Sequence, residues 1–287
     1  MTPPHHNPMR AVTLEAAGLT LRGFSVSGLA TWLTVPELNV VFDLGVCPLD
    51  AVAMDQVMVT HMHADHMQGL SRHWQLRAMM NHRPAVYYVP ESAIDGLREI
   101  AAIEGRMRGE APAEPDLRAL PLTPTKLPRT KGGWAYAFPV RHRALSVGYT
   151  VGRTTHRLRP EFEGMPGQQL AELRKTTVIS DAVDKALVTF IGDCDAQTLT
   201  EQAHIWHSRV LVLECTYVAP DDLPRAARHT HTHLDEIADM LRANEAPAVE
   251  ALVLKHFSMK SGPAEVRDRV ASAVPKAWRG RVQLLLA

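Results

Sequence analysis

The sequence predicts a single α/β domain with β-sheets inside and helices outside. Short apolar runs with the spacing of strands recur along the chain, and segments with helical spacing lie between the later ones. The chain has no internal repeat, no low-complexity segment and no linker able to separate two domains. Its 287 residues, 46% of them hydrophobic, suffice for a large core. We therefore expect residues 1–287 to form one domain.

The first half predicts four strands, then a helix and an irregular stretch. The strands are expected at 21–26, 30–35, 39–45 and 56–61, and the last two are rich enough in Val and Phe to be buried. Residues 91–105 have helical spacing, with Glu91 and Ser92 at the start and Gly105 at the end. Residues 106–133 are rich in Pro, Arg, Glu and Gly, which predicts a loop or lid excursion.

The second half predicts six more strands and two helices. The strands are expected at 134–142, 146–152, 185–193, 208–217, 249–258 and 281–287. Helical spacing at 233–244 and 263–274 places the helices between the later strands. Alternation of strand and helix is typical of sheets covered by helices.

Composition restricts the classes of function. Lys plus Arg equals Asp plus Glu, 31 each, which argues mildly against extended contact with nucleic acid. The three cysteines are widely spaced and form no Cys-x-x-Cys pair, so neither a disulfide framework nor a zinc ribbon is indicated. The sequence shows no apolar run of membrane-spanning length and no signal-peptide pattern at its start. We expect a cytoplasmic protein that does not enter the membrane.

The strongest motif is MVTHMHADHMQGL (58–70), directly after an apolar strand. On an extended strand end, His61 and His63 lie on one side, and Asp65 and His66 follow where the chain turns toward a helix. Such a loop can aim two imidazoles at one cation, and the next carboxylate and imidazole at a second. The alternative is a polar strand end with local hydrogen bonds only. Three His and one Asp within six residues make that alternative the weaker one.

Four ligands cannot fill two catalytic metal sites, so further ligands should stand at other strand ends. His142 ends the run FPVRH, Asp193 ends VTFIGD after Gly192, and His256 ends LVLKH. Active-site residues gather at such strand ends in α/β folds. Each alone is more often an ordinary polar strand terminus, but as a set they complete the cluster at 61–66.

This ligand order resembles that of the metallo-β-lactamase superfamily, over nearly the whole chain. The resemblance implies an αβ/βα four-layer sandwich with two metal ions at one edge. It implies His61, His63 and His142 on one metal, Asp65, His66 and His256 on the other, and Asp193 bridging both. VVFDLG (40–45) is similar to the family's strand that ends in Asp-x-Gly, so Asp43 is implied to support the ligands from behind.

Within the superfamily the chain most resembles ribonuclease Z, the endonuclease that trims the 3′ side of precursor tRNA. The similar segments are RHRALSVGY (141–149), LRPEFEGMPGQQLAELRK (158–175), LECTYV (213–218), HTHLDEIA (231–238) and LKHFSMKS (254–261). Matching these motifs implies that Glu214 and His231 form a pair that aids departure of the leaving group. HTHTH (229–233) permits a one-step shift, so His229 or His233 is an alternative to His231.

Two segments depart from the ribonuclease Z pattern. That family inserts a long Gly/Pro-rich arm, which grasps the tRNA elbow, between the positions of His142 and Asp193. Only 50 residues separate those positions here, and the sequence predicts no arm among them. LKHFSMKS also lacks the Arg-Tyr that often follows His-Phe-Ser. These departures and the neutral charge favour a smaller substrate, whereas Glu214, His231 and the HFS segment favour RNA.

The function expected from this set is hydrolysis of a phosphodiester. Two divalent cations, zinc in the first place with manganese or iron as alternatives, would lower the pKa of a shared water and supply a metal-bridging hydroxide. Asp65 would orient and deprotonate the attacking water, and His231, fixed by Glu214, would protonate the departing oxygen. The arginines of 141–159, among them Arg141 and Arg143, either bind phosphate or form a solvated face.

Three alternatives to a ribonuclease Z-like endoribonuclease remain at this stage. The same metal centre could hydrolyse a small phosphodiester or an ester, with 106–133 as the lid of its pocket. A di-iron oxidoreductase could use the same scaffold. A non-catalytic binding protein is disfavoured by the complete ligand set. The expected partners are a phosphodiester such as precursor tRNA or another RNA and, from the family resemblance, a second copy of the chain in a homodimer.

Overall fold

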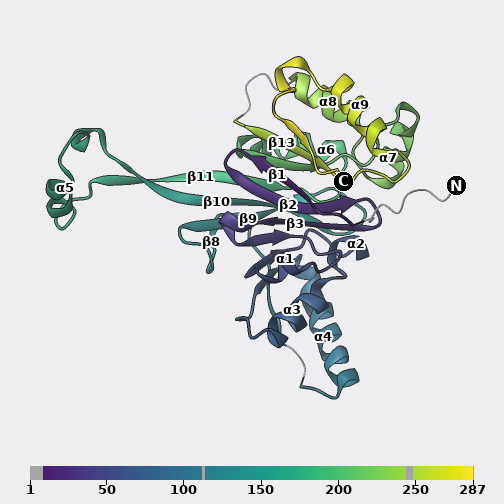
Figure 1. Cartoon of the computed structure of the whole chain (residues 1–287), viewed down its shortest axis with the longest axis horizontal. Coiled ribbons are helices and arrows are strands. Elements are labelled where there is room, and N and C mark those ends of the chain that lie inside the picture. Colours follow the sequence, from purple (N-terminus) through teal and green to yellow (C-terminus); the bar gives the residue numbers. More distant parts are fainter. Residues whose placement is uncertain (1–8, 112–113, 244–247, 287) are drawn as a thin grey trace.

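Two mixed β-sheets of seven strands each pack face to face in the computed structural model, which describes residues 9–111, 114–243 and 248–286 (Figure 1). The first sheet is built from the N-terminal half in sequence order: β1 (Val12–Ala16), β2 (Leu19–Val26), β3 (Ala30–Val35), β4 (Val40–Phe42), β5 (Gln56–Met58), β6 (Val86–Tyr88) and β7 (Asp116–Arg118). The second sheet runs from β14 back to β8: β14 (Val282–Leu284), β13 (Ala251–Lys255), β12 (Val210–Glu214), β11 (Ser180–Phe190), β10 (Ser146–Leu158), β9 (Gly133–Val140) and β8 (Thr125–Lys126).

Strand direction brings many strand ends to one edge. β4 to β7 are mutually parallel in the first sheet, as are β11 to β14 in the second. β9 runs in the same direction as β11, because each of them pairs antiparallel with β10. The carboxyl ends of these strands therefore lie together, where polar side chains of both sheets can meet.

Helices cover the outer face of each sheet and complete four layers. The first sheet carries α1 (Leu49–Val52), α2 (Ala64–Met67), α3 (Leu70–Met79) and α4 (Ile94–Arg108). The second carries α6 (Ala196–Glu201), α7 (Leu223–His229), α8 (Leu234–Ala243) and α9 (Pro263–Ala273). In Figure 1 the two groups lie on opposite sides of the paired sheets. The predicted αβ/βα sandwich is confirmed by this arrangement.

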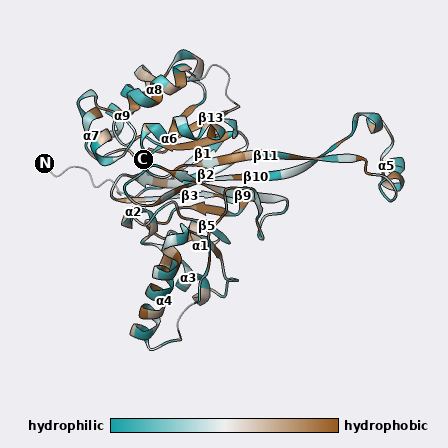
Figure 2. Cartoon of the chain, turned by 180° about the vertical axis from the view of Figure 1, so that it is seen from behind, coloured by the Kyte–Doolittle hydropathy of each residue, from teal (hydrophilic) through white to brown (hydrophobic). Residues whose placement is uncertain are grey.

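The hydrophobic core consists of three clusters, each lying between two adjacent layers. One cluster fills the space between the sheets, where Phe42 and Phe190 stack with ring centroids 4.7 Å apart. Two further clusters lie between each sheet and its helices. α8 shows the pattern, since Leu234, Ile237, Ala238 and Leu241 form one buried stripe. Figure 2 accordingly shows the strands between the helix layers mainly in brown.

Most predicted elements are present with shifted ends. The strands expected to reach residues 45 and 61 end at Phe42 and Met58, because the chain leaves the sheet at Asp43 and Thr60 to build the functional site. The helix expected at 91–105 begins with a 3₁₀ turn and runs to Arg108, where Gly109 at φ 69° ends it. The final residues of the helix 233–244 and the strand 281–287 lie outside the described residues.

The prediction that no arm is present was wrong. β10 and β11 continue beyond the sheet as a two-stranded arm, which ends in α5 (Gly167–Leu173) (Figure 1). Their pairing reaches from Tyr149–Phe190 out to Leu158–Ser180, with a register shift at Val151/Gly152 where the arm begins. Polar and charged residues dominate this stretch, so its sequence lacks the apolar period that marks a buried strand.

Residues 106–133 connect the two sheets. They contain the end of α4, then β7 at the edge of the first sheet and β8 at the edge of the second. The expected excursion is therefore partly regular, and its use as a lid stays a prediction. Among the helices described, none has the length and apolar character needed to cross a membrane.

Candidate metal centre

Seven His and Asp side chains converge where the carboxyl ends of the strands meet. His61 and His63 follow β5, Asp65 and His66 belong to the loop and first turn of α2, His142 follows β9, Asp193 follows β11, and His256 follows β13. All seven positions singled out by the sequence are therefore brought together. The turn at Gly192 passes so close to Thr60 that a Cβ there would overlap its side chain, which accounts for glycine before Asp193.

Four of the histidine rings donate outward through Nδ1. His66 Nδ1 donates to Asp43 at 2.8 Å and His142 Nδ1 to the Thr230 carbonyl at 2.9 Å. The hydroxyl of Thr60 donates to Asp43, so its oxygen accepts from His61 Nδ1 at 3.0 Å. In the same way the hydroxyl of Thr216 donates to Glu214 and accepts from His256 Nδ1 at 3.0 Å. In its neutral form each ring therefore presents Nε2 as an acceptor toward the centre of the cluster.

These inward nitrogens lie close to one another. His61 Nε2 lies 3.0 Å from His63 Nδ1, and His142 Nε2 lies 3.4 Å from the same atom. On the other side His66 Nε2 lies 3.3 Å from His256 Nε2. Lone pairs at such distances repel unless a positive centre lies between them, so the donor set fits a bound cation.

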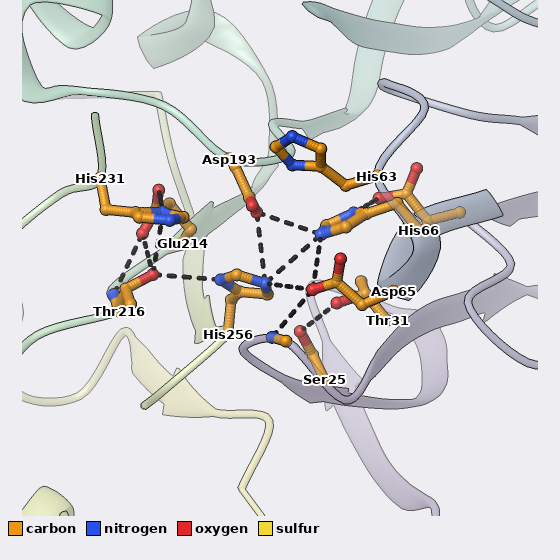
Figure 3. A network of polar contacts seen from close by, with 12 residues as sticks. Ser25, Thr31, His63, Asp65, His66, Asp193, Glu214, Thr216, His231 and His256 are labelled. Atoms are coloured by element: carbon orange, nitrogen blue, oxygen red, sulfur yellow. Dashed lines mark hydrogen bonds and ion pairs between the residues drawn. The ribbon is translucent and has the colours of Figure 1, made fainter. Parts of the chain in front are cut away.

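The carboxylates join the two groups of rings. Asp193 Oδ1 lies 3.2 Å from His66 Nε2 and 3.4 Å from His256 Nε2, while Oδ2 faces His61 and His142 at 3.7 and 3.9 Å. Figure 3 shows His66 and His256 pointing toward Asp193. Asp65 Oδ2 lies 3.4 Å from His256 Nε2 and accepts a hydrogen bond from the Gly28 amide at 2.9 Å.

The ligand atoms fall into two adjacent sets that each suit one divalent cation. His61, His63, His142 and Asp193 form one, and Asp65, His66 and His256 the other, with the ligand atoms of each set within 4.8 Å of one another. Imidazole nitrogen with carboxylate oxygen is a ligand combination that zinc and other divalent transition metals bind in enzymes. The geometry therefore agrees with two neighbouring cation sites.

Electrostatics favour cation binding by these groups. Burial, reinforced by His66, lowers the pKa of His61 to about 2, so its ring stays neutral. Burial also opposes a charge on His66, but Asp193 and Asp43 outweigh it and raise the pKa of His66 to about 10. The positive charge that the carboxylates attract to His66 is one that a bound cation would supply in place of a proton.

Two residues of this site have unusual backbone conformations. Asp43 and His256 have φ of 52° and 65°, in the left-handed region that non-glycine residues rarely adopt. Both are fully enclosed, and their side chains are fixed by hydrogen bonds to Thr60 and Thr216. Strain of this kind is found where the surrounding structure fixes a functional side chain.

Glu214 and His231 form a pair beside the metal ligands. Glu214, at the end of β12, is buried and accepts from His231 Nδ1 at 2.8 Å and from the Cys194 amide at 2.8 Å. Burial opposes a charge on His231, but Glu214 outweighs it and raises the pKa of His231 to about 9. The side chain is 14% exposed. The pair has the arrangement of a proton donor held by a carboxylate.

The structure separates the three histidines of HTHTH. His233 is buried, donates to the Ala219 carbonyl through Nε2 and accepts from the Asp235 amide, which places it at the start of α8. His229 is partly exposed at the end of α7. Only His231 of the three contacts Glu214. Reasoning from sequence had no means of finding Thr60 and Thr216, whose hydroxyls fix His61 and His256 and which carry no metal-site signal of their own.

The chain belongs to the β-lactamase superfamily domain family, whose model matches residues 44–257. That segment includes every one of the seven clustered side chains and the Glu214–His231 pair. Family membership and the two-sheet architecture agree with the superfamily expected from the sequence.

The individual proteins to which the chain is similar include members of the tRNase Z group. The chain is 28% identical over 275 residues to tRNase Z TRZ1 of Arabidopsis thaliana, which covers 94% of this chain and 95% of that protein. It is similar in fold to human tRNase Z, short form, with a TM-score of 0.53 and 16% identity over 96% of this chain and 89% of that one. The metallo-β-lactamase fold protein YhfI of Bacillus subtilis is also similar, with a TM-score of 0.59 and 13% identity over 91% and 93% of the two chains.

Proposed function

We propose that the chain is a ribonuclease Z-like endoribonuclease that hydrolyses a phosphodiester on the 3′ side of precursor tRNA. The observation that carries the proposal is the Glu214–His231 pair beside two adjacent cation sites. Cation sites alone suit many hydrolases, but a protonated histidine beside them suits a substrate whose leaving group is an alkoxide. The similarity to tRNase Z over most of the chain supports the same assignment.

Two bound divalent cations, zinc in this proposal, would lower the pKa of water at the site and offset the charge growing on the phosphoryl oxygens. His61, His63 and His142 would hold one, Asp65, His66 and His256 the other, with Asp193 shared. Asp65 Oδ2, oriented by the Gly28 amide, would accept a proton from the attacking water.

His231 would act on the opposite side of the reacting phosphorus. Its Nδ1–H is committed to Glu214, so the proton given to the departing 3′-oxygen comes from Nε2. Attack of the water oxygen on phosphorus breaks the bond to that 3′-oxygen. The products are a 3′-hydroxyl on the tRNA and a 5′-phosphate on the trailer.

The arm gives the proposal a substrate-binding element. It is exposed and carries nearly equal numbers of basic and acidic residues, so its use would depend on shape and hydrogen bonding more than on net charge. β10 begins at Ser146 beside the metal ligands and extends 13 residues, about 40 Å at the usual rise of a strand. α5, at the tip of the arm, lies at one end of the molecule, whereas α2 and α7, which flank the site, lie toward the other end (Figure 1).

This separation favours a homodimer in which the arm of one copy serves the site of the other. The proposal is tested by mixing two inactive proteins, one lacking the arm and one carrying His63→Ala with the arm intact. Recovery of about a quarter to a half of wild-type cleavage of precursor tRNA is expected after subunit exchange. No recovery from a mixture that is shown to contain mixed dimers would contradict it.

The cytoplasmic location expected from the sequence stays a prediction.

The catalytic proposal is tested with zinc-loaded protein on precursor tRNA and on bis(p-nitrophenyl) phosphate. Wild type is expected to cleave both and to leave a 3′-hydroxyl on the tRNA, and His63→Ala to cleave neither. Cleavage of the small diester alone would favour a small-molecule phosphodiesterase. Cleavage of neither, with two equivalents of metal bound, would contradict phosphodiester hydrolysis.

A further inference from the structure

The turn between α7 and α8 is bound to both halves of the catalytic apparatus. Thr230 has φ of 58°, a left-handed conformation that costs energy for a β-branched residue, and it ends α7. Its carbonyl accepts the hydrogen bond that orients the candidate metal ligand His142. The next residue is His231. One short piece of backbone therefore sets the ring of a metal ligand and the place of the proton donor.

The exposed side chain of Arg143 also reaches the end of α7. Arg143 Nη2 donates to the Arg228 carbonyl at 2.6 Å, at the end of α7. The last carbonyls of a helix lack partners within the helix and carry partial negative charge, so a guanidinium there is favourable. Since Arg143 follows His142 directly, the loop after β9 holds the turn by two bonds, at residues 228 and 230.

The neighbouring Arg141 makes contacts of a different kind. Arg141 Nε lies 3.1 Å from Asp195 Oδ2 and its Nη1 3.7 Å from Glu201, at α6 and away from the turn. Arg141 and Arg143 are both exposed and both flank His142, yet only Arg143 bonds to the turn that carries His231. A role for Arg143 as part of a general basic surface would be shared by Arg141, and the two can be compared directly.

We propose that Arg143 is a positioning residue for His231: it holds the end of α7, and so keeps the imidazole against Glu214 and at the leaving oxygen. The expected effect on the rate of tRNA cleavage rests on the proposed function, whereas the expected shift in the position of His231 does not. Loss of the Arg143 bond would free the end of α7 at Arg228 and let His231 shift, while His142 keeps its bond to the Thr230 carbonyl and the other metal ligands keep theirs.

The kinetic test compares Arg143→Met, Arg143→Lys and the matched control Arg141→Met, each with two equivalents of zinc. For Arg143→Met the single-turnover rate on precursor tRNA is expected to fall about tenfold with KM within about twofold, because misplacement of a proton donor lowers the rate and not binding. Hydrolysis of bis(p-nitrophenyl) phosphate should stay within about twofold, since p-nitrophenolate leaves without protonation. Arg143→Lys should recover part of the loss, and Arg141→Met should show none.

A rise in KM on tRNA alone would make Arg143 a phosphate-binding residue and overturn the proposal. So would equal losses on both substrates, or an equal effect of Arg141→Met. A second readout is independent of activity: the ring ¹H–¹⁵N signals of His231 in the zinc-loaded protein should shift in Arg143→Met and not in Arg141→Met. Shifted signals in a protein that cleaves neither substrate would refute the proposed function but not the positioning role, whereas unshifted signals would refute the positioning role.

Discussion

At one end of the paired sheets, seven His and Asp side chains from both sheets meet, and the outward nitrogens of four rings have identified partners. At the other end, β10 and β11 leave the sheet as an exposed arm held by cross-strand pairing and a few surface contacts, such as Arg159 with Asp181. The first region is rigid because its polar groups fix one another. The second depends on backbone pairing, and a lone two-stranded ribbon has little stability of its own.

The comparison separates chemistry from substrate choice. The metal end holds the groups to which we assign hydrolysis of the phosphodiester, and the arm is the element to which we assign recognition of a large RNA. The arm contains no candidate catalytic cluster within the part of the chain that the structure describes, but it adds a long surface. Changes to the metal ligands should therefore affect all substrates, and changes in the arm only large ones.

The largest effect is expected at Asp193. Asp193→Asn removes the carboxylate that lies against both sets of histidines, so hydrolysis of precursor tRNA and of bis(p-nitrophenyl) phosphate should both fall by about a thousandfold or more. The matched control is Asp195→Asn, two residues away, where the side chain caps α6 and pairs with Arg141 at the surface. Because asparagine also caps helices and the pair with Arg141 is at the surface, that control should change stability by less than about 1 kcal/mol and leave kcat unchanged. A similar loss of activity in both variants would contradict the assignment of Asp193.

His231→Gln should have the next largest effect and should depend on the leaving group. Removal of a proton donor is expected to lower the rate on precursor tRNA about a hundredfold, with a much smaller loss on bis(p-nitrophenyl) phosphate. His229→Gln, at the partly exposed end of α7, is the control and should behave as wild type. Equal losses on the two substrates would show that His231 acts on the metal site and not on the leaving group.

A smaller effect, on stability, is expected at Lys255. This side chain is fully buried beside the metal end, its Nζ lies 4.8 Å from the Phe190 ring centroid, and it has no hydrogen-bond acceptor among the described residues. Lys255→Met replaces a buried unpaired ammonium with an apolar chain of similar length, which should raise the free energy of unfolding by about 1–3 kcal/mol. Urea denaturation of both proteins with chelator present measures the difference. A less stable variant would show that the ammonium makes a favourable interaction in the core.

The metal end was largely predictable from sequence because its signal is chemical and local. His61, His63, Asp65 and His66 stand together in the chain, and His142, Asp193 and His256 each follow an apolar strand. What could not be predicted depends on tertiary structure. Thr60 and Thr216 act only because Asp43 and Glu214 lie beside them in the fold. The choice of His231 depends on the left-handed Thr230, although Glu236, whose carboxylate accepts from the His233 amide, was a usable sign that His233 starts a helix.

The arm could not be predicted for a different physical reason. A strand is recognised from sequence by the apolar side chains it buries, and β10 and β11 bury almost none beyond the sheet. Their pairing is carried by backbone hydrogen bonds, which every sequence offers. The rest of the fold was predictable because both faces of the central strands are covered, so that VVF, VLVLE and ALVLK are continuous apolar runs.

The most direct test of the division between chemistry and substrate choice is removal of the arm. Residues 155–183 would be replaced by Asn-Gly, which joins the paired residues Thr154 and Asp184 through a two-residue turn. With zinc bound, kcat/KM for precursor tRNA is expected to fall about a hundredfold or more, equivalent to about 2.7 kcal/mol of lost binding, while that for bis(p-nitrophenyl) phosphate stays within about twofold. Unchanged cleavage of the tRNA, or an equal loss on both substrates, would contradict the account.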